Sequence, residues 1–165
     1  MITPGPVSFA YGGLDPPTMT GGPIADGTYT LTRGTCYSSA GCVDACASGT
    51  FERVDALRFT GTNYERVAGN CPTPHGESGV FAAADGGNLD LQLSPNVLAL
   101  APKCGDAEAS VPRQTLPSGN GFVGTFRYSS DGGVLSVLSE HSVTLRGYYG
   151  PVSGSEFCLR EYVKR

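Results

Sequence analysis

The stretch from Val80 to Leu93, VFAAADGGNLDLQL, carries most of the information about the fold. Its second half, Leu89–Leu93, alternates leucines with polar residues, the period-two pattern of a strand with one face in a core and one in water. Its first half, Val80–Ala84, is a short apolar run. Asp85-Gly86-Gly87 separates the halves and suits a tight turn, because glycine adopts the positive φ angles that such turns need. The stretch therefore predicts an antiparallel hairpin.

The same sequence pattern recurs along the chain, where short alternating runs are separated by glycine, asparagine and aspartate. A second Asp-Gly-Gly, at residues 131–133, separates another pair of such runs. No stretch longer than a few residues carries the 3.6-residue period of a helix. The predicted strands lie at 28–37, 53–60, 64–68, 80–84, 89–93, 122–128, 134–138, 142–149 and 157–163.

Eight or nine short strands with tight connections predict an all-β fold. Because successive strands are joined by short glycine-rich loops, we expect a meander that closes into an antiparallel up-and-down barrel of the lipocalin-like kind. A Greek-key β-sandwich is the alternative.

The first 26 residues differ from the rest in composition. Their prolines and paired glycines sustain neither a helix nor a central strand, so we expect residues 1–26 to form an arm or linker. Residues 27–165 are predicted to form a single β domain. Since the first 20 residues hold few large apolar side chains, we expect them to add little stability.

The formal net charge is −4 and the eleven basic residues are scattered, which argues against nucleic acid as a partner because phosphate binding needs a concentrated basic face. No run approaches the ~20 apolar residues of a membrane-spanning helix, so no transmembrane segment is expected. The N-terminus also shows no basic start followed by an apolar run, the pattern of a secretory leader.

Six cysteines leave three alternatives for their chemistry. A zinc site could use the pair Cys42 and Cys46 with Cys71 and His75, but two cysteines would remain unexplained. A redox site wants a C-x-x-C pair, and none occurs. The even count favours disulfides and hence an oxidising compartment, either secreted or in the cell envelope. The cysteines are Cys36, Cys42, Cys46, Cys71, Cys104 and Cys158.

Six cysteines permit fifteen connectivities, among which sequence does not choose. Our preferred set joins Cys42 to Cys46 as a loop clip and Cys71 to Cys104 across the central hairpin. Cys36–Cys158 would then link the first and last strands, which are neighbours if the sheet closes.

No catalytic constellation stands out, so we predict no catalytic residue, no metal and no cofactor. The nucleophile-elbow motif G-x-S-x-G is absent. His75 and His141 are interpreted as loop residues. Tyrosines and arginines near the end of the chain could line a polar-aromatic binding site, although β-propensity alone also places tyrosines in strands. These candidates are Arg127, Tyr128, Arg146, Tyr148 and Tyr149.

Three segments resemble those of small cell-envelope lipoproteins of the myxobacterial kind, which carry a Pro/Gly-rich arm followed by one all-β domain. GGPIADGTYTLT (21–32) resembles their opening strand. ALRFTGTNYERV (56–67) and GVFAAADGGNLDLQLSPNV (79–97) resemble their middle hairpins. The resemblance implies an envelope location and a β domain, and it assigns no activity.

The expected function is therefore a non-enzymatic role in structure, in binding a protein partner or in self-assembly, in a secreted or envelope-attached bacterial domain. A lipocalin-like carrier of a small apolar ligand is one alternative, and a small secreted hydrolase is another. An interior cavity lined by Leu, Val and Phe would favour the carrier, a His near a Ser and a carboxylate the hydrolase, and an exposed apolar patch the assembly role.

We expect a filled or nearly filled interior, without a cavity in the ~300–1,000 Å³ range of ligand pockets. Small residues on the predicted inward faces, at Ala82, Ala84, Gly124 and Gly147, would offset the bulky leucines at 89–93.

Overall fold

The structure is a computed structural model that describes residues 5–7, 9–39, 42, 52–70, 74–94, 100, 103–104, 107–108, 122–147 and 150–165. Every regular element in these residues is a strand, so they contain no helix that could cross a membrane. The strands are β1 (Gly5–Pro6), β2 (Phe9–Gly13), β3 (Gly27–Ser38), β4 (Glu52–Thr60), β5 (Asn63–Asn70), β6 (His75–Ala84), β7 (Asn88–Leu93), β8 (Lys103–Cys104), β9 (Ala107–Glu108), β10 (Phe122–Asp131), β11 (Val134–Gly147) and β12 (Gly150–Lys164).

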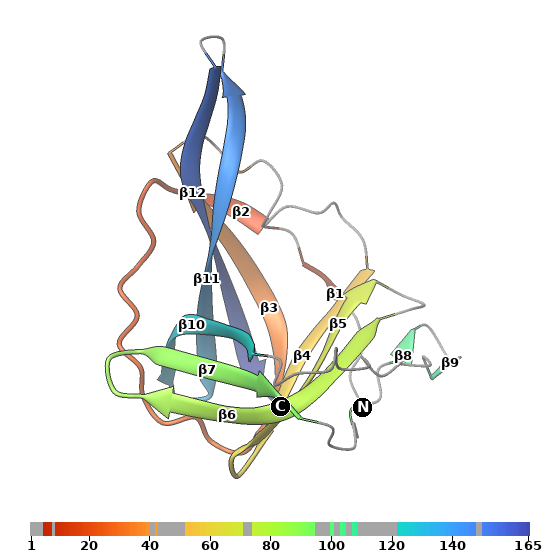
Figure 1. Cartoon of the computed structure of the whole chain (residues 1–165). Coiled ribbons are helices and arrows are strands. Elements are labelled where there is room, and N and C mark those ends of the chain that lie inside the picture. The colour runs from red at the N-terminus through yellow and green to blue at the C-terminus, as the bar shows by residue number, and fades with distance from the viewer. Residues whose placement is uncertain are drawn as a thin grey trace.

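Eight of these strands close into a barrel (Figure 1). They follow one another around it in chain order, from β3 through β4, β5, β6, β7, β10 and β11 to β12. Each neighbouring pair is antiparallel, and β12 pairs with β3 to close the ring. The predicted up-and-down barrel is confirmed, and the fold is not the Greek-key sandwich.

The hairpin around Asp85-Gly86-Gly87 forms as predicted. Gly86 and Gly87 take φ angles of 92° and 84°, which side chains rarely tolerate. Leu89 and Leu91 are buried, whereas Ala82 and Ala84 are exposed. The expectation that these two alanines leave space inside the barrel is therefore wrong. They share the outer face with the polar residues of β7, since Ala82 pairs with Asp90.

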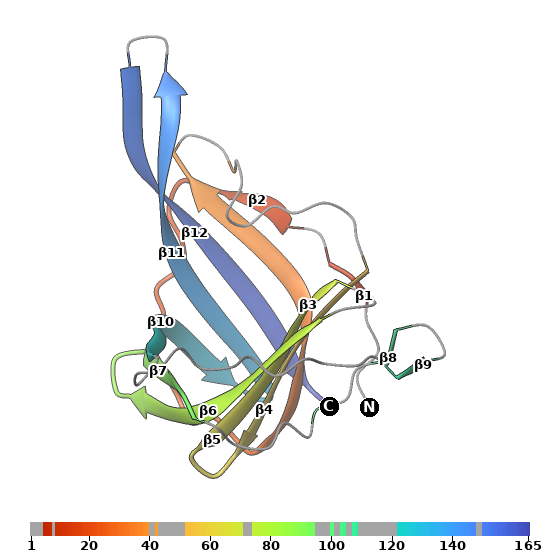
Figure 2. The same cartoon turned by 45° about the vertical axis from the view of Figure 1, so that its right-hand side comes forward.

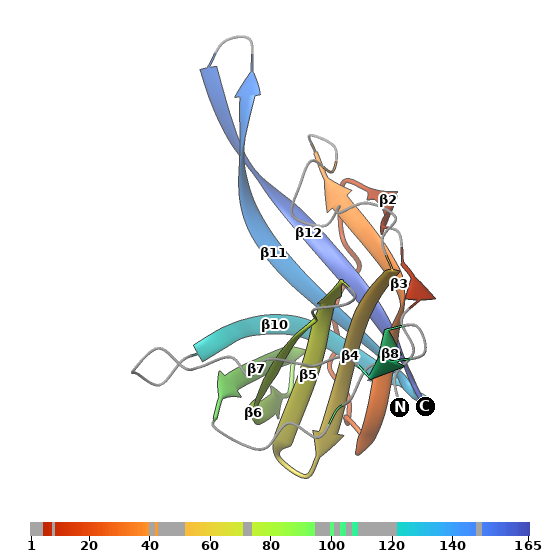
Figure 3. The ribbon, with the colours of Figure 1, turned by 90° about the vertical axis from the view of Figure 1, so that its right-hand side faces the viewer.

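The strands predicted at 134–138 and 142–149 are one long strand, β11. It pairs with β12 without interruption from Val134↔Val163 to Gly147↔Gly150. The far end of this two-stranded ribbon extends beyond the other strands (Figures 1 and 3). His141 lies within β11, so its interpretation as a loop residue is wrong. His75 likewise begins β6 and is not in a loop.

The N-terminal segment completes the barrel wall where β3 and β4 separate (Figure 2). These strands pair only over residues 27–30 and 56–59. Beyond that point β1 pairs with β4 through Gly5↔Arg53, and β2 runs parallel to β3 through Phe9↔Gly34. The segment expected to be a simple arm thus supplies two short strands of the main sheet.

The remainder of the arm packs against the outside of the barrel. Met19 is buried on Leu138 and Leu159, which face outward from β11 and β12. The Tyr128 hydroxyl donates to the Gly22 carbonyl at 2.8 Å. Thr20 N–H donates to Ser129 Oγ at 2.8 Å. The arm therefore covers apolar surface and satisfies polar groups of the barrel. That it adds little stability stays a prediction.

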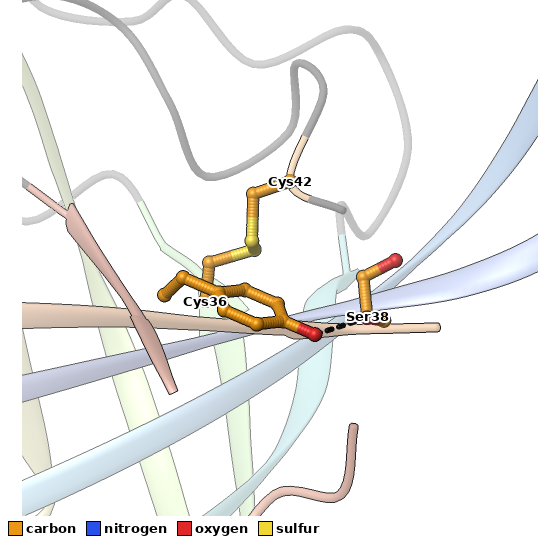
Figure 4. Close-up of a disulfide and its surroundings, with 4 residues drawn as sticks. Cys36, Ser38 and Cys42 are labelled. Atoms are coloured by element: carbon orange, nitrogen blue, oxygen red, sulfur yellow. Dashed lines mark hydrogen bonds between the residues drawn. A yellow bond between two sulfur atoms is a disulfide. The ribbon is translucent and has the colours of Figure 1, made fainter. Parts of the chain in front are cut away.

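A disulfide joins Cys36 of β3 to Cys42, just beyond the end of that strand (Figure 4). Next to it, the Tyr11 hydroxyl donates to the Ser38 carbonyl at 3.2 Å. The expected pairs Cys42–Cys46 and Cys36–Cys158 are therefore wrong.

Cys36 and Cys158 do lie opposite each other in the β3–β12 register, as barrel closure requires, and both are buried. Cys158 is also disulfide-bonded. The third expected pair involves Cys71, which lies outside the described residues.

Candidate functional site

The barrel interior contains a cavity of about 160 Å³ that is partly open to solvent. Its volume lies below the ~300–1,000 Å³ range of ordinary ligand pockets. We expected no cavity within that range. Its lining differs from expectation, because polar and charged side chains accompany the apolar ones. The lining residues are Leu57, Arg66, Leu89, Leu91, Phe126, Val137, Ser139, His141, Arg160 and Tyr162.

Arg66 contacts the carboxyl groups of two acidic residues. Asp55 of β4, whose side chain is fully buried, accepts bonds from Arg66 Nε at 3.3 Å and from Arg66 Nη2 at 3.2 Å. Glu77, directly opposite Arg66 on β6, lies 3.8 Å from Arg66 Nη1. The two-point contact with Asp55 fixes the plane of the guanidinium group and matches its charge inside the barrel.

These contacts shift the pKa values of the groups involved. The charge of Asp55 raises the pKa of Arg66, which stays protonated. Burial raises the pKa of Glu77, and the neighbouring Arg66 offsets part of that rise. Burial also raises the pKa of Tyr162, whose hydroxyl hydrogen-bonds Asp55. Desolvation disfavours the charged form of an acid, and this is why the pKa values of both Glu77 and Tyr162 are raised.

A second polar group lies on β11 and β12. Arg160 Nη1 donates to Ser139 Oγ at 2.9 Å, and Ser139 Oγ lies 3.1 Å from His141 Nε2. Ser139 is buried, and Arg160 and His141 are half-buried. Residues 139 and 141 face the same side of β11 because side chains alternate along a strand. The register places Arg160 opposite Val137, which faces the cavity too.

Phe9 of the N-terminal segment packs against this group. The Arg160 guanidinium carbon lies 5.6 Å from the centre of the Phe9 ring, within cation–π distance. Gly34 makes room for the ring, because a Cβ atom at residue 34 would come within 2.6 Å of Phe9. β2 therefore contributes directly to the surroundings of the site.

The arrangement suits binding of a small molecule. Leucine, valine and phenylalanine side chains form an apolar wall of the cavity, and a few convergent hydrogen-bonding groups border it as well. This combination is the usual composition of a ligand site. Metal binding has no comparable support: no group of three or more His, Cys, Asp or Glu side chains gathers among the described residues. The zinc alternative also needs the Cys42 thiolate, which is bonded to Cys36.

Of the predicted polar-aromatic site, the structure places Arg127 and Tyr128 on opposite faces of β10. Tyr128 is buried in the core, whereas its neighbour Arg127 is exposed on the outer face, 5.7 Å from the Phe157 ring. Arg127 pairs with Leu138 on β11, and Arg146 lies eight residues further along that strand, about 26 Å at the rise of an extended chain. Tyr148 and Tyr149 lie outside the described residues.

Sequence reasoning missed Asp55, Arg66, Glu77, Ser139 and Arg160. One signal for the first two is visible in the sequence: Asp55 is in phase with Leu57 and Phe59, and Arg66 is in phase with Tyr64. A charged residue in phase with a core face needs a partner, because an unpaired buried charge is costly. Ser139 and Arg160 offered no comparable signal, since both lie in runs of mixed polarity.

No family model, curated protein or solved structure matches this chain.

Proposed function

We propose that this protein is a non-enzymatic, secreted or envelope-attached barrel that binds a small molecule in its interior. The observation that carries the proposal is the partly open cavity of about 160 Å³, with its apolar wall and convergent polar groups. Eight-stranded barrels are wide enough to hold one small ligand when side chains leave the space.

This proposal modifies the expected structural or assembly role. That role would be favoured by an exposed apolar patch on the barrel. The outward-facing apolar side chains of Leu138 and Leu159 are covered by Met19 of the same chain. The cavity favours the carrier alternative instead, although its charged groups argue for a more polar ligand than a purely apolar one.

The proposed secreted or envelope location rests on the disulfides and on the resemblance to envelope lipoproteins. The Cys36–Cys42 bond and the bonded Cys158 support an oxidising compartment, because cytosolic thiols are kept reduced. The resemblance to envelope lipoproteins of the myxobacterial kind supports the same location, and it makes a bacterial source part of the proposal.

Ligand-observed NMR with a panel of ring-sized fragments tests the binding role. We expect a subset of the fragments to bind the wild-type protein. The Val137→Phe variant should not bind them, because the larger side chain fills the cavity. Val134→Phe is the matched control, because Val134 lies on the same strand and is 39% exposed. Circular dichroism checks that both variants fold, since overpacking costs about 1–3 kcal/mol. If no fragment binds, or if both variants bind equally, the interior is not a ligand site.

The Ser139–His141 pair is the observation that favours the alternative hydrolase. A hydroxyl within hydrogen-bond reach of an imidazole in a cavity is the arrangement from which serine nucleophiles are built. Release of nitrophenol from p-nitrophenyl acetate tests this alternative. Turnover that is abolished by Ser139→Ala would establish an enzyme, and a rate that Ser139→Ala leaves unchanged would dismiss this pair.

A further inference from the structure

The hairpin of β11 and β12 has two edges that no other described strand covers at its far end. Pairing of β10 with β11 ends at Leu138, and pairing of β3 with β12 ends at Glu156. Residues 142–147 of β11 and 150–155 of β12 pair with each other and extend past the other strands (Figures 1 and 3). We call these residues the projecting ribbon. An isolated two-stranded ribbon is at best marginally stable in water, so further strands would stabilise this one.

Alternate residues of β11 direct their backbone groups toward the edge that faces away from β12. The Lys164 N–H donates to the Gly133 carbonyl at 2.8 Å, and the register continues from there to the end of the ribbon without interruption. Because hydrogen-bonded and non-hydrogen-bonded pairs alternate in an antiparallel ladder, the odd-numbered residues of β11 bond to β12. The even-numbered residues of the ribbon direct their N–H and C=O groups away from β12, where none of the described strands pairs with them. They are Ser142, Thr144 and Arg146.

The two edges of the projecting ribbon differ in their capacity to accept another strand. On the β12 edge, Pro151 stands opposite Arg146, at a position where the backbone nitrogen points outward. Proline has no N–H to donate there, and proline protects sheet edges against pairing. The β11 edge contains no proline, and it includes the β-branched residues Val143 and Thr144, which favour strands. The β11 edge is therefore the one open to pairing.

We infer that the β11 edges of two copies of this chain pair antiparallel about a two-fold axis at Val143, so that the two ribbons form one continuous sheet. In this register Ser142 of one copy pairs with Thr144 of the other, and Glu140 pairs with Arg146. Even-numbered residues then face even-numbered residues, as hydrogen bonding between these edges requires. Each copy presents the same segment, which is the arrangement of a symmetric dimer. The inference goes beyond the proposed binding function and does not depend on it.

Charge complementarity favours a second copy as the occupant of this edge. Glu140 and Arg146 lie three residues on either side of Val143, so the two-fold axis places opposite charges across the interface at both ends. Opposite charges that face each other across antiparallel strands attract, whereas like charges repel. Glu140 is exposed, and the Ser155 hydroxyl that donates to its Oε1 at 2.8 Å carries no charge. Moving the axis to either neighbouring residue would keep the hydrogen bonding and lose both charge pairs.

Sedimentation velocity tests the inference with a matched pair of proline variants. We expect the wild-type protein to sediment as a dimer at micromolar concentrations. Thr144→Pro should weaken the dimer at least about tenfold, because it removes an N–H directed at the second copy and leaves the bonds between β11 and β12 in place. Ser153→Pro is the control and should leave the dimer intact, since Ser153 stands opposite Thr144 and its N–H lies at the other edge of the ribbon. A monomeric wild-type protein, or equal effects of the two variants, would overturn the inference.

Exchange of the two charges tests the register without proline. Glu140→Arg and Arg146→Glu should each weaken the dimer about tenfold, because each places like charges opposite one another at both ends. The double variant, Glu140→Arg with Arg146→Glu, should dimerise as the wild type does. A double variant that dimerises no better than the single variants would overturn the inference. Circular dichroism checks that the variants fold, and the wild-type measurement needs no variant.

Discussion

The Asp55–Arg66 pair links two neighbouring strands at the level of single side chains. Asp55 is fully buried and Arg66 is 26% exposed at its side chain. The pair brings a charge into the barrel wall that would otherwise be expensive to bury, and it positions Arg66 at the cavity.

Replacing Asp55 by Asn should lower the free energy of unfolding by about 3 kcal/mol, because Arg66 would keep its charge and lose its main partner. Arg33→Gln is the control, since the Arg33–Glu161 pair has an arginine that is 68% exposed. It should cost less than about 1 kcal/mol. Urea denaturation measures both, and equal costs would show that burial does not strengthen the Asp55–Arg66 pair.

Glu77 predicts a pH dependence of stability. Its pKa is raised in the folded state above the ordinary value of 4.5, so the folded protein holds this proton after the unfolded chain has released it. The contribution of Glu77 to stability therefore falls as pH rises from about 4.5 through the folded pKa. Urea titrations of wild type and Glu77→Gln across this window should show the variant gaining relative stability as pH rises. A constant difference would contradict the raised pKa.

At the scale of elements, the N-terminal segment is the main departure from a simple meander. Because β3 and β4 pair over only part of their length, their free edges would expose unpaired backbone groups, and exposed edges invite association with other chains. β1 and β2 occupy these two edges. The segment that follows then crosses the outside of β11 and β12.

Two residues of similar size in this segment, Met19 and Leu14, allow a matched test of its contribution to stability. Met19→Ala should cost about 2 kcal/mol, because Met19 is buried on Leu138 and Leu159. Leu14→Ala, in the same segment but 60% exposed, should change stability by less than about 0.5 kcal/mol. Thermal unfolding followed by circular dichroism gives both values. A Met19→Ala variant as stable as wild type would instead support the expectation that the arm adds little stability.

At the scale of the whole molecule, the disulfides restrict the unfolded chain as well as supporting the barrel. With Cys36 bonded to Cys42 and Cys158 bonded elsewhere, full pairing of all six cysteines leaves three connectivities, in which Cys158 joins Cys46, Cys71 or Cys104. The other two cysteines would then form the third bond.

Thiol titration of the unfolded, unreduced protein should find no free thiol, and a non-reducing peptide map should recover Cys36 linked to Cys42. Replacing both cysteines by alanine should cost about 2 kcal/mol, a value typical of a short closed loop. A recovered Cys36–Cys158 peptide would contradict the structure, and two or more free thiols would undermine the secreted or envelope location.

Much of the fold was predictable because its signals are local. The alternation in Leu89–Leu93 and the glycines of Asp85-Gly86-Gly87 act between residues adjacent in sequence, and they specified the hairpin correctly. The error at His141 has a local cause too: the polar residues of 139–141 resemble a turn, although in the structure they continue β11, and Ser139 and His141 border the cavity.

The site was not predictable in the same way. Asp55 and Arg66 are separated by eleven residues and Ser139 and Arg160 by twenty-one. Their contacts depend on the register between strands, and a shift of one residue would move each side chain to the other face of the sheet.

Local pattern alone thus specifies an all-β chain of short strands joined in sequence order. Only the tertiary structure determines that the N-terminal segment completes the wall, that Cys36 bonds Cys42 rather than Cys158, and that basic groups border the cavity. The reason is physical: alternation and turn chemistry involve near neighbours, whereas register, disulfide partners and buried charge pairs are set by which distant segments the closed barrel brings together.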